Sequence, residues 1–105
     1  MIERLDALEA EFADVEARMA DPTTIADQSR YRDLARRHKE LDAIVTRARE
    51  LRGRSGDAAT AREMVIELSG DDREMIREEL VEADADAARL TAELELLLLP
   101  KDKND

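Results

Sequence analysis

The chain has 105 residues, of which 42% are charged. Its formal net charge of −10 argues against the whole chain being a nucleic-acid-binding module. With one phenylalanine, one tyrosine and no tryptophan, it can build only a thin core, and its length allows a single modest domain. Seventeen alanines, against three glycines and two prolines, favour helix over sheet. The predicted fold class is therefore all-α.

Two further absences bear on the compartment. There is no cysteine, which excludes a disulfide framework and a thiolate metal site and agrees with a reducing environment. The N-terminal residues 1–4 enter an acidic amphipathic pattern directly, and the longest apolar run, residues 96–99, is too short to span a bilayer. We expect a cytoplasmic protein with no membrane partner.

The first predicted helix covers residues 2–20, because apolar side chains recur there at intervals of three and four. This line consists of Leu5, Leu8, Phe12, Val15 and Met19. Asp21 and Pro22 end the helix, since proline cannot continue the hydrogen-bond ladder. Residues 21–26 are predicted to form a turn.

The second predicted helix begins near Asp27 or Ser29, either of which can cap it. Its apolar line consists of Tyr31, Leu34, His38, Leu41, Val45 and Ala48, widened by Ile44 and Leu51. The stretch 53–57 contains two glycines and a capping aspartate, which predicts a flexible connection and the best candidate for local disorder.

A short helix is predicted over residues 58–68, with Ala61, Leu68 and either Met64 or Val65 facing inward. The last helix, residues 71–99, has a heptad-like seam and a length of roughly 40 Å. Asp71 and Glu74 are predicted to cap it. The seam consists of Ile76, Leu80, Ala83, Ala87, Leu90, Leu94 and Leu97. Short connections favour an antiparallel bundle of three long helices and one short helix, as a monomer or weak dimer.

Residues suited to catalysis or metal binding are few. His38 is the only histidine and lies on the inward line of its helix, so we interpret it as a polar residue at the core edge. Glu78, Glu79 and Glu82 are typical of a solvated helix face, although such a cluster can hold a cation. The three glycines do not form a phosphate-binding loop. We predict no catalytic residue, no cofactor, no metal and no small-molecule substrate, so the chain is not expected to be an enzyme.

Basic residues gather in the middle of the chain. The net charge is −5 over residues 1–26, +4 over 27–54 and −9 over 55–105. On a helical wheel of about 100° per residue, five of the basic side chains lie opposite the apolar line. This basic stripe consists of Arg32, Arg36, Lys39, Arg47 and Arg54. It is either a solvated face paired with neighbouring acids or a contact surface for phosphates or an acidic protein.

Several segments of the sequence resemble one known family. They are Met19-Ala20-Asp21-Pro22, Ile25-Ala26-Asp27-Gln28, Ala61-Arg62-Glu63-Met64 and residues 97–105, which read Leu-Leu-Leu-Pro-Lys-Asp-Lys-Asn-Asp. In this order they resemble the N-terminal helical domain of bacterial peptide chain release factor 1, a class I factor that reads UAA and UAG stop codons. The departures are Lys103, where that family commonly has proline, and Arg37-His38, where it often has Glu-Tyr.

The resemblance implies a role in translation termination on the ribosome. In that family a Gly-Gly-Gln tripeptide supports peptide release and a Pro-x-Thr tripeptide in a later domain reads the codon. Here no two glycines are adjacent, and Pro22-Thr23-Thr24 lies in a predicted turn of the first domain, where we interpret it as a helix terminator followed by a loop. The resemblance therefore implies a docking domain, residues 1–99, that faces the ribosomal stalk base and the class II release-factor GTPase. We expect residues 100–105 to begin the connection to an absent central domain. The alternative is an autonomous helical module that acts through self-association or as an adaptor.

Overall fold

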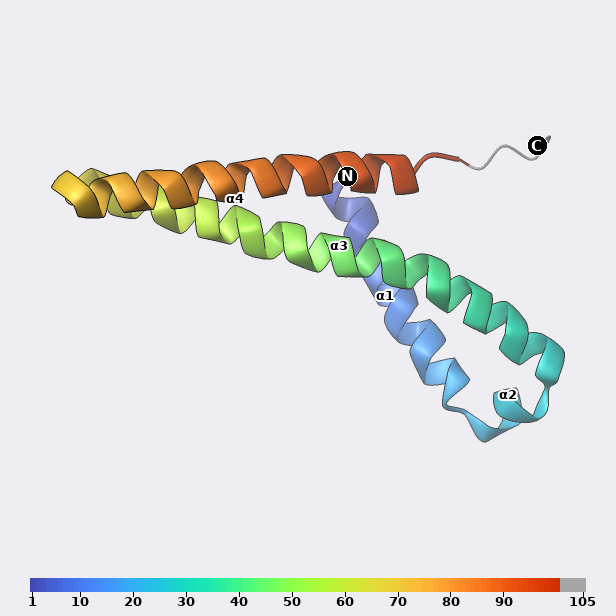
Figure 1. Cartoon of the computed structure of the whole chain (residues 1–105). Coiled ribbons are helices and arrows are strands. Elements are labelled where there is room, and N and C mark those ends of the chain that lie inside the picture. Colours follow the sequence, from blue (N-terminus) through green and yellow to red (C-terminus); the bar gives the residue numbers. More distant parts are fainter. Residues whose placement is uncertain (101–105) are drawn as a thin grey trace. The chain divides into compact units, whose positions relative to one another are not determined.

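The structure, a computed structural model, describes residues 1–100 (Figure 1). It contains α1 (Ile2–Met19), α2 (Pro22–Ala26), α3 (Gln28–Glu67) and α4 (Gly70–Leu97). Three helices are long, one is short, and no strand occurs among the described residues, so the all-α prediction is confirmed. Most of the predicted connection at 100–105 lies outside the described residues, as does the end of the Leu-Pro-Lys-Asp segment. The chain divides into two compact units, unit 1 (Met1–Thr46) and unit 2 (Arg47–Asp105).

Unit 1 is built from α1, α2 and the first part of α3. The α1 seam is confirmed, since Leu5, Phe12 and Val15 are buried while Leu8 and Met19 are partly buried. Its core consists of Phe12, Val15, Leu41 and Val45, with Leu8, Met19 and Leu34 packed against it. The apolar line predicted for the second helix therefore faces α1 over most of its length. Its first residue, Tyr31, is exposed.

The turn predicted for residues 21–26 is wrong, because this segment forms the one-turn helix α2. Asp21 is its N-cap, and the carboxylate accepts hydrogen bonds from the Thr23 backbone N–H at 2.9 Å and from the Thr23 hydroxyl at 2.8 Å. Pro22 occupies the first helical position, where its fixed φ suits a helix and its missing N–H costs nothing. The same proline that ends α1 therefore begins α2.

The predicted break at residues 53–57 is also wrong. α3 runs without interruption from Gln28 to Glu67, so the predicted second helix and the predicted short helix over 58–68 are one element. A glycine inside a helix costs only about 1 kcal/mol relative to alanine, which burial on either side can offset. Ala48 before the glycines and Ala58 and Ala61 after them are buried. The start of α3 agrees with the sequence, because the Asp27 carboxylate accepts a hydrogen bond from the Arg30 backbone N–H at 3.2 Å.

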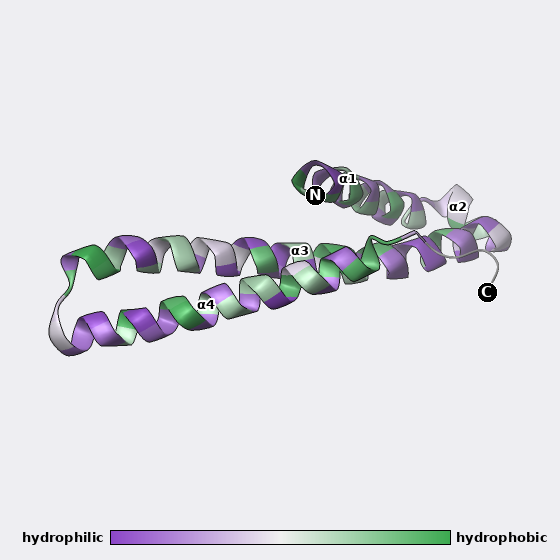
Figure 2. Ribbon diagram, turned by 90° about the horizontal axis from the view of Figure 1, so that it is seen from above, coloured by the Kyte–Doolittle hydropathy of each residue, from purple (hydrophilic) through white to green (hydrophobic). Residues whose placement is uncertain are grey.

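Unit 2 is a hairpin of the second part of α3 and the antiparallel α4, joined by a short turn (Figures 1 and 2). Both helices consist largely of hydrophilic residues, with apolar residues at intervals along each of them (Figure 2). The buried residues of this unit are Ala48, Ala58, Ala61, Ala83, Leu90, Leu94 and Leu98. Four of the seven are alanine, so this core is made largely of small side chains.

Two details at the ends of α4 correct the sequence prediction. At its end Leu98 is buried whereas Leu97 is 42% exposed, because Leu90, Leu94 and Leu98 follow one another at intervals of four. At its start the helix begins at Gly70, whose φ is +63°, and Ser69 is the N-cap without a side-chain hydrogen bond. The predicted Asp71 cap is therefore not formed. Asp71 lies inside the first turn, where its charge still suits the helix dipole.

Candidate functional site

The structure divides the basic stripe between the two units. Arg32, Arg36 and Lys39 lie on the part of α3 that belongs to unit 1, and all three are exposed. The nearest acid to Arg36 is Asp33, at 4.0 Å, and the Arg36 side chain remains 78% exposed. The guanidinium groups of Arg32 and Arg36 and the ammonium group of Lys39 are therefore open to a partner. We call these three residues the open stripe.

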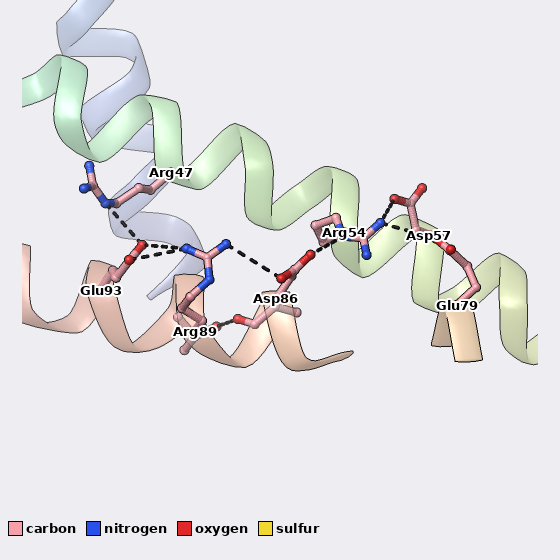
Figure 3. Close-up of polar contacts among 9 residues, drawn as sticks. Arg47, Arg54, Asp57, Glu79, Asp86, Arg89 and Glu93 are labelled. Carbon is pink, nitrogen blue, oxygen red and sulfur yellow. Dashed lines mark hydrogen bonds and ion pairs between the residues drawn. The ribbon is translucent and has the colours of Figure 1, made fainter. Parts of the chain in front are cut away.

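The remaining two stripe residues, Arg47 and Arg54, contact carboxylates of α4 inside unit 2 (Figure 3). Arg47 Nε lies 3.4 Å from Glu93 Oε2, and Glu93 also binds Arg89 at 3.3 Å. These two arginines thus link α3 to α4 instead of lying on an open face. The helical wheel took into account only the apolar line that packs against α1, and it placed both arginines opposite that line. In unit 2, a different side of α3 packs against α4.

Arg54 is the centre of a small ion-pair cluster (Figure 3). Its Nε donates to Asp86 Oδ2 at 2.9 Å, and its Nη1 donates to Asp57 Oδ2 at 2.8 Å and lies 3.5 Å from Glu79 Oε1. The hydrogen bonds to Asp57 and Asp86 raise the pKa of the guanidinium. Arg89 extends the cluster by approaching Asp86 at 3.8 Å. Beyond it, Arg62 binds Asp84 at 2.7 Å, so ion pairs connect α3 with α4 at successive points.

An ion pair between α1 and α3 of unit 1 was not predicted from the sequence. Arg37 of α3 donates two hydrogen bonds to the Glu11 carboxylate of α1. Its Nε lies 2.5 Å from Oε2, and its Nη2 lies 2.7 Å from Oε1. A further contact joins Arg37 to Glu40 at 3.2 Å. The hydrogen bond from Arg37 holds the pKa of the Glu11 carboxyl below its ordinary value, against a smaller opposing effect of burial. The only sequence signal for this ion pair was a charged residue beside the apolar line of each helix. The register between α1 and α3 decides which of these charges meet.

His38 occupies the core edge of unit 1, as predicted. Its ring stacks on Phe12 with centroids 4.7 Å apart and an interplanar angle of 28°. Its Nε2 lies 4.0 Å from Glu16 Oε2, so the neighbouring acid comes from α1. The imidazole therefore serves as a packing surface with a polar edge.

Within residues 1–100, no group of three or more histidine, cysteine, aspartate or glutamate side chains is placed to hold a metal ion. This includes Glu78, Glu79 and Glu82, of which Glu79 is directed to Arg54. In the same part of the chain, no helix combines the length and the apolarity that crossing a bilayer requires. The fold and these side chains define a helical domain that presents charged faces to its surroundings.

Comparison with known proteins identifies the family. The chain matches the PCRF domain over residues 8–105, and it belongs to that family. Peptide chain release factor 1 of Acidobacterium capsulatum is 41% identical over 105 residues, which is all of this chain and 29% of the relative. Peptide chain release factor 1 of Deinococcus deserti is 43% identical over 102 residues, or 97% of this chain and 27% of the relative. The chain thus spans less than a third of the length of these relatives, and no solved structure matches it.

Proposed function

We propose that the chain is the helical docking domain of a translation termination factor that directs peptide release at UAA and UAG codons. The observation that carries this proposal is the family match, which extends over residues 8–105 and is accompanied by relatives named peptide chain release factor 1. Codon reading and ester hydrolysis are assigned to other parts of such a factor. In this proposal residues 1–99 form one domain of a cytoplasmic protein.

Docking requires exposed groups that a partner can recognise, and the two units offer groups of opposite charge. The open stripe of Arg32, Arg36 and Lys39 is suited to an anionic surface, such as ribosomal RNA at the stalk base. Arg47 and Arg54 are not part of this surface, because they pair with carboxylates of α4. The class II release-factor GTPase is the second partner that we assign to this domain.

A chimeric factor tests the function. The region of the Acidobacterium capsulatum relative that aligns with this chain is replaced by residues 1–105, and a second variant lacks that region. We expect the chimera to bind ribosomes and release peptide at UAA and UAG as the relative does, while the truncated variant loses ribosome affinity. A chimera that behaves like the truncated variant would contradict the proposed function.

The open stripe is tested in the same chimera by Arg36→Glu with Lys39→Glu. If both side chains meet phosphates, ribosome affinity falls and the salt dependence becomes shallower by about two in its logarithmic slope. Arg73→Glu with Arg77→Glu is the matched control, since it changes charge equally on exposed residues of unit 2. Equal effects of the two pairs, with both proteins folded, would leave the open stripe as a solvated face.

Self-association is the second candidate, and exposed leucines favour it. Leu96, Leu97 and Leu99 are 70%, 42% and 62% exposed near the end of α4. Three side chains fall short of the roughly 800 Å² per partner that a stable interface buries. Sedimentation of the chain should therefore give a monomer, and a dimer that persists at micromolar concentration would favour self-association.

A further inference from the structure

Unit 2 contains a shallow groove between α3 and α4, in the half that lies toward the hairpin turn. Its volume is about 240 Å³. It is lined by Asp57, Thr60, Ala61 and Met64 from α3 and by Ile76 and Glu79 from α4. We call it the hairpin groove. Its residues all belong to unit 2, so its shape depends on this hairpin alone.

The groove has an apolar floor because small and long side chains meet there. Ala61 is buried and too short to fill the space between the helices, whereas Met64 is 42% exposed and Ile76 is half-buried. A methionine in such a position is adaptable, since its unbranched thioether can follow the shape of an incoming side chain. The floor therefore offers apolar surface that folding has not covered.

Asp57 and Glu79, the two acids that line the groove, both contact Arg54, and the segment that forms the hairpin turn next to the groove is acidic. Residues 63–82 contain eight acids and two arginines, a net charge of −6. Of these eight acids, only Glu79 takes part in an ion pair with another described residue, at 3.5 Å from Arg54. Among residues 1–100 the others have no cationic partner. Farther along the hairpin the carboxylates of Asp84, Asp86 and Glu93 are paired with arginines, so the uncompensated charge gathers at the turn end.

We propose that the hairpin groove binds a basic amphipathic helix of a partner protein. The apolar face of that helix contacts Met64 and Ile76, and its lysines or arginines face the acids around the turn. Apolar anchors seated in a groove between helices are an established mode of peptide recognition. Charge complementarity excludes RNA as the occupant, because the surrounding carboxylates repel phosphate. The inference rests on the groove and its charge and does not require the proposed role in termination.

The test uses the whole chain and a synthetic peptide probe. The probe is an 18-residue helix of leucine and lysine, with leucines on one face, and binding is followed by fluorescence anisotropy at two salt concentrations. A peptide of the same composition with scrambled leucines keeps the charge and removes the apolar face. We expect the amphipathic probe to bind at least about tenfold more tightly than the scrambled one, which corresponds to burial of one or two apolar side chains.

Variants of the chain locate the site. Met64→Gln should weaken the amphipathic probe by roughly fivefold, since it removes apolar contact at similar size. Ile66→Gln is the matched control, because Ile66 is 82% exposed on the same helix and does not line the groove. Glu67→Gln with Asp72→Asn should weaken both peptides and make the salt dependence shallower.

Three outcomes would overturn the proposal. One is equal binding of the amphipathic and scrambled peptides, which would mean attraction by charge alone. Another is an equal effect of Met64→Gln and Ile66→Gln, which would place the site elsewhere. The third is binding of a labelled single-stranded RNA to the chain that Met64→Gln weakens, which would assign this end of the hairpin to nucleic acid. Circular dichroism of each variant confirms that the helices are retained.

Discussion

Leu90 lies in the seam of α4 and is only 1% exposed. Replacing it by alanine removes three carbon atoms from a packed site and leaves a cavity, so Leu90→Ala should cost about 2–5 kcal/mol of unfolding free energy. The control is Leu96→Ala on the same helix, where the side chain is 70% exposed and the change should stay within about 0.5 kcal/mol. Urea denaturation measures both, and a loss at Leu90 no greater than at Leu96 would remove Leu90 from the core.

Glu11 makes the stability of unit 1 depend on pH. Its pKa is lower in the folded chain than its ordinary value of 4.5, chiefly because Arg37 donates hydrogen bonds to it. Its stabilising contribution is therefore complete above that value and is lost as the pH falls through the lower, folded pKa. Since the side chains of Arg37 and Glu11 are 40% and 39% exposed, solvent screening limits the contribution to at most about 1 kcal/mol.

We expect Glu11→Gln to be less stable than the native chain at pH 7 and equal to it near pH 2, as measured by thermal unfolding. The same substitution in an Arg37→Gln background should show no such pH dependence, because the partner that lowers the pKa is gone. A Glu11→Gln effect that is the same at both pH values would show that the ion pair does not contribute through the charge of Glu11.

At the scale of elements, the continuity of α3 through its two glycines is the feature most open to experiment. An added Cβ at Gly53 or Gly56 meets no atom within 4 Å, and both residues are helical. Gly53→Ala and Gly56→Ala should therefore each stabilise the chain by about 0.5–1 kcal/mol, because alanine loses less backbone entropy in a helix.

Gly70 provides the contrast for this prediction. It also has open space around it, but its φ of +63° is a conformation that L side chains rarely adopt. Gly70→Ala should destabilise the chain by about 1–2 kcal/mol. Thermal unfolding of the three variants compares them directly. If the substitutions at 53 and 56 were neutral or destabilising, the segment would be a flexible connection in solution.

At the scale of the whole molecule, we expect this chain alone neither to read stop codons nor to release peptide. It has no adjacent glycines and a single glutamine, so the Gly-Gly-Gln tripeptide of the release factor family does not occur in it. The purified chain is added to ribosomes that carry peptidyl-tRNA at UAA, UAG or a sense codon, with a full-length relative as the positive control. Release by this chain above the sense-codon background would contradict the prediction.

The elements differ in how far the sequence predicted them. The bounds of α1, the seam of α1, the seam of α4 as far as Leu94 and the Asp27 cap followed from apolar spacing and capping residues, both of which act locally. The helical state of residues 53–57 did not follow, because glycine propensity indicates a break and only the burial of Ala58 and Ala61 overrides it. At Pro22 the same proline that stops one helix starts another, and the choice depends on the Asp21 cap.

The candidate site shows the same division. Composition, periodicity and the segments that resemble the release factor family were enough to determine an all-α release-factor domain with a basic segment between acidic ones. The tertiary structure alone decided that Arg47 and Arg54 bind carboxylates of α4 while Arg32, Arg36 and Lys39 remain exposed. The reason is physical: a helical wheel gives the direction of each side chain around its own axis. Which of those directions meets another helix depends on packing and register, which are set by residues far away in the sequence.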